Sequence, residues 1–223
     1  MSQSKEQEVF GKLSRACIVA VTVVDRPEDA VPLAEALMEG GVTAMELTLR
    51  TPAALEALRL LRRDAPQMLT GVGTVLTPEQ ALQVLEHGAE FGVAPGMNPR
   101  VVEAALNAGL PFAPGVCTPS DIERALEFDR KLLKLFPAEP SGGLTYLKTV
   151  AAPYAHLGVR YIPLGGLSQN NLADYLREPA VGGIGGSWIA PRDAILSGNW
   201  AGITAAARNA IRVRDIERSG MQS

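Results

Sequence analysis

The residue that stands out for possible chemistry is Lys134, in the stretch Lys131-Leu-Leu-Lys-Leu-Phe-Pro-Ala-Glu139. This short apolar run stops at Pro137 and is typical of a buried strand in a parallel sheet whose outer face is covered by helices. Because side chains alternate along a strand, Lys134 lies on the opposite face from Leu133 and Leu135. The pattern therefore predicts a lysine that points away from the helices and into the interior.

Two interpretations of this lysine follow from the stretch alone. In the first, it is a core lysine that extends its charged end to water. In the second, it is an amine so poorly hydrated that it gives up its proton and acts as a nucleophile. Lys131 lies at the entrance of the same strand, where its ammonium group reaches water, so it is the weaker candidate. Other polar residues of the chain favour the second interpretation.

A second predicted strand carries polar residues on the face that should point inward. In Met45-Glu-Leu-Thr-Leu-Arg50, the polar residues Glu46, Thr48 and Arg50 alternate with apolar ones. The apolar set should face the covering helices, which leaves the polar set inside. A buried charge is costly unless it is paired or used in chemistry. The alternation therefore favours a functional role for Glu46 and Arg50.

Glycine-rich segments mark the third strand and the last two strand ends. Leu69-Thr-Gly-Val-Gly-Thr74 combines glycines, which let a ligand approach the backbone, with the hydroxyl of Thr74. Pro163-Leu-Gly-Gly-Leu-Ser168 follows the seventh predicted strand, and Gly182-Gly-Ile-Gly-Gly-Ser-Trp188 spans the eighth. Loops of this kind after strands seven and eight form a recurrent phosphate site in (β/α)8 barrels. Close packing of helix on strand would also need glycine, but finding both loops in the expected places favours phosphate.

Together these side chains predict a reaction class. Lys134 can add to a ketone and form a Schiff base, which is an electron sink for cleavage of a neighbouring carbon–carbon bond. Glu46 can move protons on and off the reacting carbon and the carbinolamine. Arg50 offers a forked, permanent charge to a carboxylate, and Thr74 offers a second contact. The substrate that fits has a carboxylate, an adjacent ketone and a distal phosphate.

Eight predicted strands, each followed by a helix, would bring these residues together. The strands cover residues 17–24, 42–49, 68–73, 91–94, 110–113, 131–135, 160–163 and 181–186. Helices should begin at cap–proline pairs such as Thr51-Pro52, Thr77-Pro78, Asn98-Pro99 and Thr118-Pro119. This alternation predicts an α/β fold, a single (β/α)8 TIM-barrel domain over residues 1–223 with a short polar helix near residues 4–15. In such a barrel the active site lies at the C-terminal ends of the strands.

Composition excludes several other classes of protein. The 223 residues carry a formal net charge of −3 and no Lys/Arg-rich block, which argues against a nucleic-acid partner. No apolar run approaches the ~18 residues of a membrane span, and the polar, acidic start is unlike a signal peptide. The two cysteines and two histidines lack the spacing of a metal site. We expect free thiols and no membrane or metal partner.

Five motifs, spread over nearly the whole chain, resemble those of one family. They are Glu46-Leu-Thr-Leu-Arg-Thr51, Gly71-Val-Gly-Thr-Val-Leu76, Pro114-Gly-Val-Cys-Thr-Pro119, Leu133-Lys-Leu-Phe-Pro-Ala-Glu139 and Gly185-Gly-Ser-Trp188. In combination they resemble the class I 2-keto-3-deoxy-6-phosphogluconate (KDPG) aldolases, which also act as 4-hydroxy-2-oxoglutarate (KHG) aldolases. The resemblance implies cleavage of KDPG to pyruvate and glyceraldehyde 3-phosphate, and of KHG to pyruvate and glyoxylate. It also implies a cytoplasmic homotrimer without a metal or other cofactor.

The same resemblance implies a role for each site residue. Lys134 would be the Schiff-base lysine and Glu46 the proton carrier. Arg50 and Thr74 would hold the carboxylate. The other substrate-binding residues that it implies, several of them at the phosphate, are Pro95, Phe136, Gly165, Gly166, Gly186 and Ser187.

Two differences from the family pattern concern hydroxyl groups. The family usually has Pro-Thr-Gly-Gly after the seventh strand, and this chain has Leu164 in place of the threonine. The turn after the fourth strand is usually Ser-Pro-Gly, and here Ala94 precedes Pro95. A galactonate-specific relative tends to have a less charged second-strand motif, so Arg50 favours the gluconate epimer, with the 6-phosphogalactonate epimer as the alternative.

The same residues are compatible with two other functions. In a phosphate-binding isomerase, Glu46 would abstract a proton and Lys134 would act only through its charge. Borohydride trapping with pyruvate separates this enzyme from an aldolase, because only an imine is reduced to a stable adduct. A barrel without catalytic activity could instead bind sugar phosphates, and a turnover assay decides that case.

Overall fold

Helices and strands alternate along the chain, as the cap–proline pairs and apolar runs predict. The computed structural model describes residues 3–220. Its helices are α1 Gln3–Ala16, α2 Ala30–Glu39, α3 Ala54–Asp64, α4 Pro78–Glu86, α5 Pro99–Ala108, α6 Pro119–Leu126, α7 Gly143–Ala151, α8 Leu172–Leu176, α9 Arg192–Leu196 and α10 Trp200–Gly220. Two 3-10 segments, η1 Pro27–Asp29 and η2 Ala152–Leu157, lead into α2 and follow α7.

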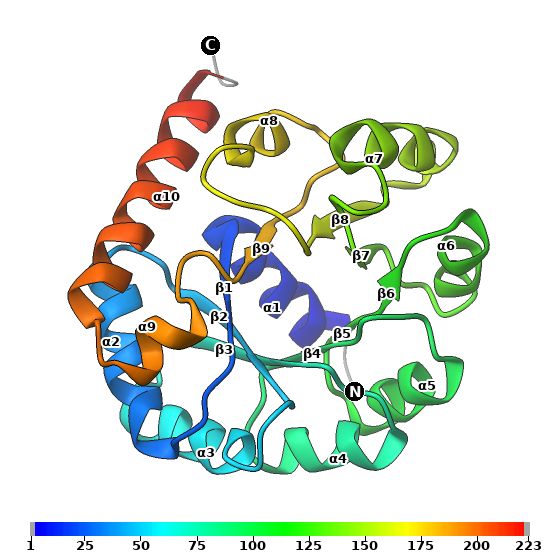
Figure 1. The fold of residues 1–223 in the computed structure, drawn as a ribbon. Coiled ribbons are helices and arrows are strands. Elements are labelled where there is room, and N and C mark those ends of the chain that lie inside the picture. The colour runs from blue at the N-terminus through cyan, green and yellow to red at the C-terminus, as the bar shows by residue number, and fades with distance from the viewer. Residues whose placement is uncertain (1–2, 221–223) are drawn as a thin grey trace.

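The strands pair in parallel and form two sheets. They are β1 Ile18–Thr22, β2 Ala44–Thr48, β3 Leu69–Gly73, β4 Phe91–Val93, β5 Phe112–Ala113, β6 Gly115–Val116, β7 Leu132–Leu135, β8 Arg160–Pro163 and β9 Ile184–Gly186. Six strands pair in the order β5-β4-β3-β2-β1-β9, and three pair in the order β6-β7-β8. The helices lie around the outside of these strands (Figure 1). The two sheets together form one curved layer with an inner face, which we call the curled sheet. The predicted α/β class with a parallel sheet is confirmed.

The fifth strand, predicted over residues 110–113, is found only at β5 Phe112–Ala113, and a further segment, β6, follows after Pro114. Proline has no backbone N–H, so it interrupts the ladder. Its carbonyl oxygen still accepts a hydrogen bond from the Lys134 backbone N–H at 2.9 Å. Between β8 and β9, Tyr161 and Val181 form an isolated parallel bridge. Backbone contacts therefore link the two sheets on both sides of the three-stranded one.

Helix starts follow the sequence prediction at three of the cap–proline pairs. Thr77 and Thr118 each form a capping box, and the Asn98 side chain accepts from the backbone N–H of Arg100. Thr51, also expected to cap a helix, instead donates its hydroxyl to the carbonyl oxygen of Val24. Helix α3 consequently begins three residues later, at Ala54.

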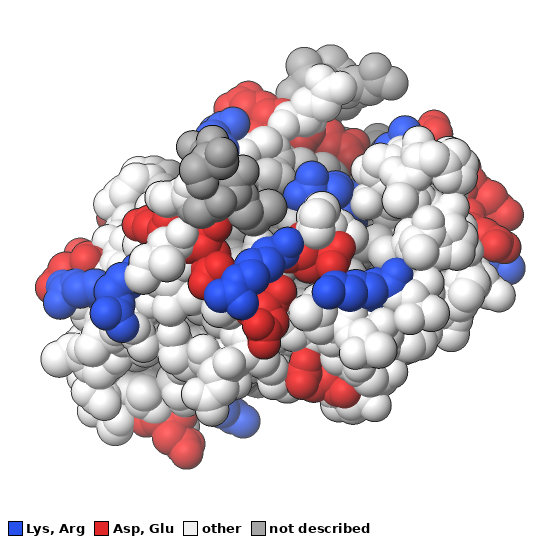
Figure 2. All heavy atoms as spheres, turned by 90° about the horizontal axis from the view of Figure 1, so that it is seen from above, with Lys and Arg blue, Asp and Glu red and all other residues white. Residues whose placement is uncertain are grey.

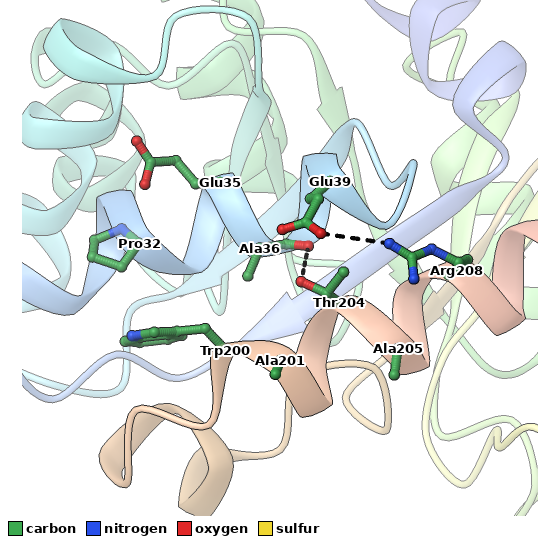
Figure 3. A pocket seen from close by; sticks show the side chains of 9 residues that line it. All are labelled: Pro32, Glu35, Ala36, Glu39, Trp200, Ala201, Thr204, Ala205 and Arg208. Carbon is green, nitrogen blue, oxygen red and sulfur yellow. Dashed lines mark hydrogen bonds and ion pairs between the residues drawn. The ribbon is translucent and has the colours of Figure 1, made fainter.

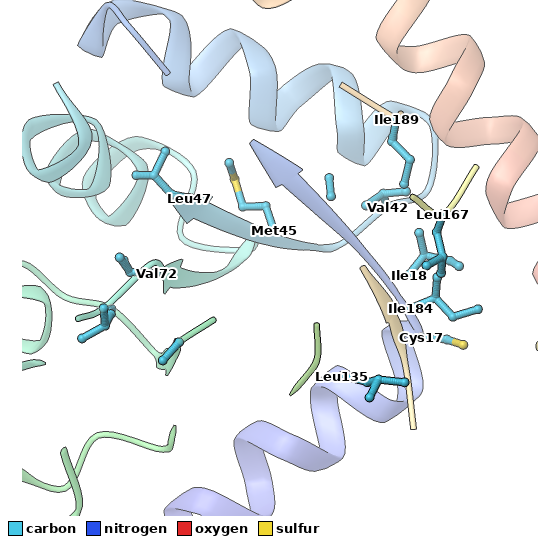
Figure 4. Close-up of a cluster of buried hydrophobic side chains, with 14 of the residues drawn as sticks. Cys17, Ile18, Val42, Met45, Leu47, Val72, Leu135, Leu167, Ile184 and Ile189 are labelled. Atoms are coloured by element: carbon cyan, nitrogen blue, oxygen red, sulfur yellow. The ribbon is translucent and has the colours of Figure 1, made fainter. Parts of the chain in front are cut away.

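Two apolar clusters lie on opposite faces of the curled sheet. The larger cluster lies between the strands and the surrounding helices and includes Met45, Leu47 and Leu135 (Figure 4). The smaller one fills part of the inner face. There, Val9 and Leu13 of α1 pack against the inward side chains of five strands, namely Val19, Ala44, Leu69, Phe91, Val93 and Ala113. Helix α1 therefore covers the N-terminal end of the curled sheet.

The last helix supports the fold from outside. Helix α10 packs along α2, where the Thr204 hydroxyl donates to the carbonyl oxygen of Ala36 at 2.9 Å. A groove between these helices is lined by residues that include Glu35 and Trp200, and Arg208 reaches Glu39 across it at 3.5 Å (Figure 3). Acidic and basic side chains are mixed on the face drawn in Figure 2. No helix within residues 3–220 is both long and apolar enough to cross a membrane.

Candidate active site

The inner face of the curled sheet holds a buried ion pair between two distant parts of the chain. The Nζ atom of Lys134 on β7 lies 2.9 Å from Oε1 of Glu46 on β2. The side chains of Lys134 and Glu46 are only 6% and 4% exposed. Both point inward because their strand neighbours Leu133, Leu135 and Leu47 face the helices. The side-chain alternation along the two strands therefore predicts correctly that Lys134 and Glu46 face the interior.

The surroundings of this pair are almost entirely apolar. Lys134 and Glu46 line a small internal cavity of about 10 Å³, whose other walls include Phe91, Ile162 and Leu164. A space of this size is close to the lower limit for one water molecule. Since charges lose hydration in such a place, a buried pair is poor evidence of added stability. It is better explained by chemistry that needs an amine and a carboxylate in contact.

Two threonines next to the pair donate to backbone carbonyl oxygens rather than to the charged side chain of Glu46. Thr48 is fully buried, as predicted, and its hydroxyl donates to the carbonyl oxygen of Thr22 at 3.0 Å. The Thr22 hydroxyl donates to the carbonyl oxygen of Glu46 at 3.3 Å. Thr22 was not singled out from the sequence, although it is the one polar residue of β1 and stands at its C-terminal end. These bonds tie β1 to the strand that carries Glu46.

Arg50 and Thr74 meet at the C-terminal ends of neighbouring strands. The Nε of Arg50 lies 3.4 Å from Oγ1 of Thr74, and Arg50 is exposed. Thr74 has a φ of 64°, which is an unfavourable conformation for a β-branched residue. Strained residues of this kind cluster at ligand sites. The structure thus brings together the two residues that the sequence suggested for a carboxylate.

The glycine-rich segment after β8 adopts backbone conformations that suit glycine. Gly165 and Gly166 have φ values of 93° and 86°. A Cβ atom at Gly165 would lie 3.2 Å from the Phe136 ring, so the loop runs beside the end of β7. The same ring centroid lies 5.7 Å from Nζ of Lys134. Phe136 therefore stands between the lysine and this loop.

The two predicted residues at the C-terminal end of β9 differ in exposure. Ser187 is exposed, whereas Gly186 is buried under the ring of Trp188, which would lie 1.5 Å from a Cβ atom at that position. A Cβ atom at Gly185 would lie 2.6 Å from the side chain of Leu164, the residue before Gly165. The two glycine-rich segments consequently start from adjacent points of the inner face.

Pro95 lies farther along the strand ends, after β4. It is half-buried, and its carbonyl oxygen is only 2.3 Å from the position of a Cβ atom at Gly115. That glycine therefore allows the two turns to approach each other. Among residues 3–220, no group of three or more histidine, cysteine, aspartate or glutamate side chains could hold a metal ion.

The glycines of β3 serve a purpose other than the one expected. We expected them to let a ligand approach the backbone. Instead, a Cβ atom at Gly71 would meet the Phe91 ring at 2.2 Å, and one at Gly73 would meet Oε1 of Glu46 at 1.8 Å. The glycines make room for inward side chains of the neighbouring strands. No single-strand pattern could have shown this, because the occupied space belongs to other strands.

A lysine in contact with a carboxylate, enclosed by a curled parallel sheet and bordered by an arginine, defines an α/β enzyme that works through an amine. A family model described as KDPG and KHG aldolase matches residues 9–206. The chain belongs to the KDPG and KHG aldolase family.

Individual relatives agree with the family model. A 2-dehydro-3-deoxy-phosphogluconate aldolase of Treponema pallidum is 44% identical over 205 residues, which are 92% of this chain and 97% of the relative. A KDPG aldolase from Legionella pneumophila, solved with pyruvate captured at low pH as a covalent carbinolamine intermediate, superposes with a TM-score of 0.86 at 38% identity and covers 92% of this chain and 97% of its own. The KDPG aldolase of Zymomonas mobilis with 3-phosphoglycerate gives a TM-score of 0.84 at 35% identity, over 92% and 95%.

Proposed function

We propose that this protein is a class I aldolase that cleaves KDPG to pyruvate and glyceraldehyde 3-phosphate through a Schiff base on Lys134. The observation that carries the proposal is the buried contact of 2.9 Å between Lys134 and Glu46. Membership of the family supports the substrate, and the carbinolamine in the Legionella pneumophila relative supports the covalent route. Cleavage of KHG to pyruvate and glyoxylate is a second reaction of the same site.

The first half of the reaction forms the imine. The Lys134 amine must lose a proton before it can attack, and the Glu46 carboxylate, at 2.9 Å, is positioned to take it. Nζ then adds to the ketone carbon of the substrate to give a carbinolamine. Glu46 returns a proton to the carbinolamine hydroxyl, which leaves as water and gives the protonated imine.

The second half breaks and repairs a carbon–carbon bond. The Glu46 carboxylate takes the proton of the C4 hydroxyl, the C3–C4 bond breaks, and glyceraldehyde 3-phosphate departs while the bonding electron pair moves into the imine to form an enamine. Protonation of the enamine carbon, again assigned to Glu46, gives the pyruvate imine. Water then hydrolyses this imine and frees Lys134.

Binding of the substrate's two ends is assigned to the strand ends around this pair. Arg50 and Thr74, which are 3.4 Å apart, would bind the carboxylate. Backbone N–H groups at Gly165 and Gly166 and the exposed Ser187 hydroxyl would bind the phosphate. The complex of the Zymomonas mobilis relative with 3-phosphoglycerate supports a site for a phosphate ester in this family. Pro95, Phe136 and Gly186 would line the space between.

The proposal also covers architecture and setting. A closed (β/α)8 barrel in a single domain is supported by the bond from the Lys134 backbone N–H to the Pro114 carbonyl and by the bridge of Tyr161 to Val181. A homotrimer in the cytoplasm follows from the family resemblance, and sedimentation of the purified protein tests the trimer.

The decisive experiment is reduction with borohydride in the presence of pyruvate. An aldolase gains the mass of a reduced pyruvyl group on Lys134, and turnover of KDPG accompanies it. An isomerase would give no adduct, and a binding protein would give neither an adduct nor turnover. Either result would overturn the proposal.

The 6-phosphogalactonate epimer is the second candidate substrate, because Leu164 weakens discrimination between the two epimers. This side chain lines the cavity beside Lys134, where the family usually has a threonine. A leucine donates no hydrogen bond, so it discriminates less well between epimers of a hydroxyl group. Kinetics of wild type and Leu164→Thr with both epimers should show gluconate preferred in both and more strongly in the variant. Galactonate preferred by the wild type would replace the first candidate with the second.

A further inference from the structure

Strand β3 has a glycine at two successive inward positions, Gly71 and Gly73. The intervening residue Val72 faces the helices and belongs to the outer apolar cluster. Neither glycine has a positive φ. Backbone conformation therefore gives no reason for glycine at either position, and the reason must lie in the space around them.

At Gly73 that space is filled by the side chain of Glu46. A Cβ atom would lie 1.8 Å from Oε1, 2.5 Å from Cδ and 2.7 Å from Cγ of Glu46. Real Cβ atoms do not approach other heavy atoms so closely, so one of the two groups would have to move. Backbone of a central strand moves less readily than a side chain, so the carboxylate would be displaced.

The direction of the Glu46 side chain explains the overlap. Glu46 pairs with Gly71 in the parallel register, and Thr48 pairs with Gly73. The glutamate side chain consequently leans along the sheet, over the residue two positions beyond its own partner. The same oxygen, Oε1, lies over Gly73 and bonds Lys134 at 2.9 Å. Filling the space over Gly73 therefore acts on the atom that contacts the lysine.

We infer that Gly73 is a positioning residue, whose missing side chain fixes the conformation in which Glu46 meets Lys134. The carboxylate is 4% exposed, so a displaced Glu46 finds no open solvent nearby and has to take another buried conformation. The effect on turnover rests on the proposed function, whereas the steric contact between residues 46 and 73 does not. Gly71 offers a matched control on the same strand and face, because its space is filled by Phe91 and not by a carboxylate.

The kinetic test compares Gly73→Ala with wild type. Since Glu46 is the proposed proton carrier, kcat for KDPG should fall by about 10²–10⁴-fold, the range for loss of a general acid–base. KM should change less than about threefold, because Arg50 and the phosphate-binding residues are untouched. Proton exchange at the pyruvate methyl group should fall together with kcat. An unchanged kcat in a folded Gly73→Ala variant would overturn the inference.

A rescue experiment separates positioning from general damage. Glu46→Asp shortens the side chain by one methylene and frees part of the space over residue 73. The loss of kcat caused by Gly73→Ala should therefore be smaller in the Glu46→Asp background, by about tenfold, a coupling typical of residues in contact. Equal losses in both backgrounds would show that residue 73 does not act through Glu46.

Thermal unfolding keeps the inference testable if Gly73→Ala folds poorly. Gly73→Ala should lower Tm by at least about 4 °C in the wild-type background and by less than about 1 °C in the Glu46→Ala background, where the overlapping atoms are absent. Gly71→Ala should cost the same Tm in both backgrounds, because it meets Phe91. If Gly73→Ala lowers Tm equally in the wild-type and Glu46→Ala backgrounds, the steric contact between residues 46 and 73 is contradicted. Failure of wild type to form the borohydride adduct would instead refute the proposed function alone.

Discussion

Lys134 and Glu46 lie 88 positions apart in sequence, yet their Nζ and Oε1 atoms are 2.9 Å apart. Each residue alone would be a charge stranded in an apolar interior, which costs several kcal/mol. As a pair they carry no net charge, and a proton can pass between them without crossing water. In the proposed reaction, this contact supplies the acid–base partner that an amine nucleophile needs at the moment of attack.

Replacing the nucleophile should abolish turnover. Lys134→Arg keeps a positive charge but has no amine that can form an imine. Lys131→Ala is the matched control, because Lys131 is exposed at the entrance of the same strand. It should keep wild-type kcat within about threefold. Peptide mapping after borohydride reduction with pyruvate should place the adduct on Lys134; an adduct on Lys131 or Lys148 would show that the nucleophile is misassigned.

Removing the carboxylate charge should slow every step that moves a proton. Glu46→Gln keeps the size of the side chain, so the fold should persist, while kcat falls by about 10²–10⁴-fold. Exchange of the pyruvate methyl protons with deuterium, followed by NMR, should slow by a similar factor. Exchange at the wild-type rate would mean that another group carries the proton.

The exposed Ser187 hydroxyl should matter only to phosphorylated substrates. Its removal should cost the ~1.5–3 kcal/mol of a hydrogen bond to a charged group, which is about 10- to 150-fold in kcat/KM for KDPG. The unphosphorylated sugar acid should react slowly with wild type, because it lacks the remote binding energy that helps to orient the reacting carbon. Ser187→Ala should leave that slow rate unchanged. Ser197→Ala, which removes a hydroxyl that donates to the carbonyl oxygen of Asp193 in α9, serves as control. Equal slowing of both substrates by Ser187→Ala would assign the serine a structural role.

Tyr161 should limit stability in alkali. Its side chain is fully buried and its hydroxyl has no hydrogen-bond partner within residues 3–220. Burial, with a smaller contribution from Tyr154, raises the pKa of Tyr161 from 10.0 to about 12. Because the folded-state pKa is the higher one, the unfolded chain loses this proton first, and stability falls as pH rises from about 10 to about 12.

The matching variant is Tyr161→Phe. It removes an unsatisfied buried hydroxyl, so it should raise the free energy of unfolding at pH 7 by about 1–3 kcal/mol and reduce the further loss between pH 10 and 12. Urea unfolding at both pH values measures this. Tyr175→Phe is the contrasting variant, because its hydroxyl donates to Glu139 and its loss should destabilise the protein at pH 7. A Tyr161→Phe variant that is less stable than wild type at pH 7 would contradict the prediction.

Strand patterns made the central pair predictable from sequence. Alternation in β2 and β7 is a local property, and it is enough to place Glu46 and Lys134 on the face opposite Leu47 and Leu133. Arg50 and Thr74 follow from the rule that parallel strands end at a common edge. These residues could be found because each depends only on the alternation within its strand or on its place at the strand end.

Other features depend on contacts between strands and could not be read in this way. Position 73 needs a glycine because the Glu46 side chain lies over it, and position 186 needs one because the Trp188 ring lies over it. The segment β6 beyond Pro114, which was not predicted, depends on its pairing with β7. Helix α1 was predicted, but its polar sequence does not say against which surface Val9 and Leu13 pack.

Helix α1 closes one end of the inner face of the curled sheet. Because Val9 and Leu13 fill the N-terminal end of the inner face, we expect substrate and products of the proposed reaction to share one entrance at the other end of the strands. In the proposed reaction, cleavage leaves pyruvate tethered to Lys134, while the aldehyde is already detached. The aldehyde therefore leaves first and pyruvate last. Pyruvate should accordingly compete with the keto acid for the empty enzyme, whereas the aldehyde should not.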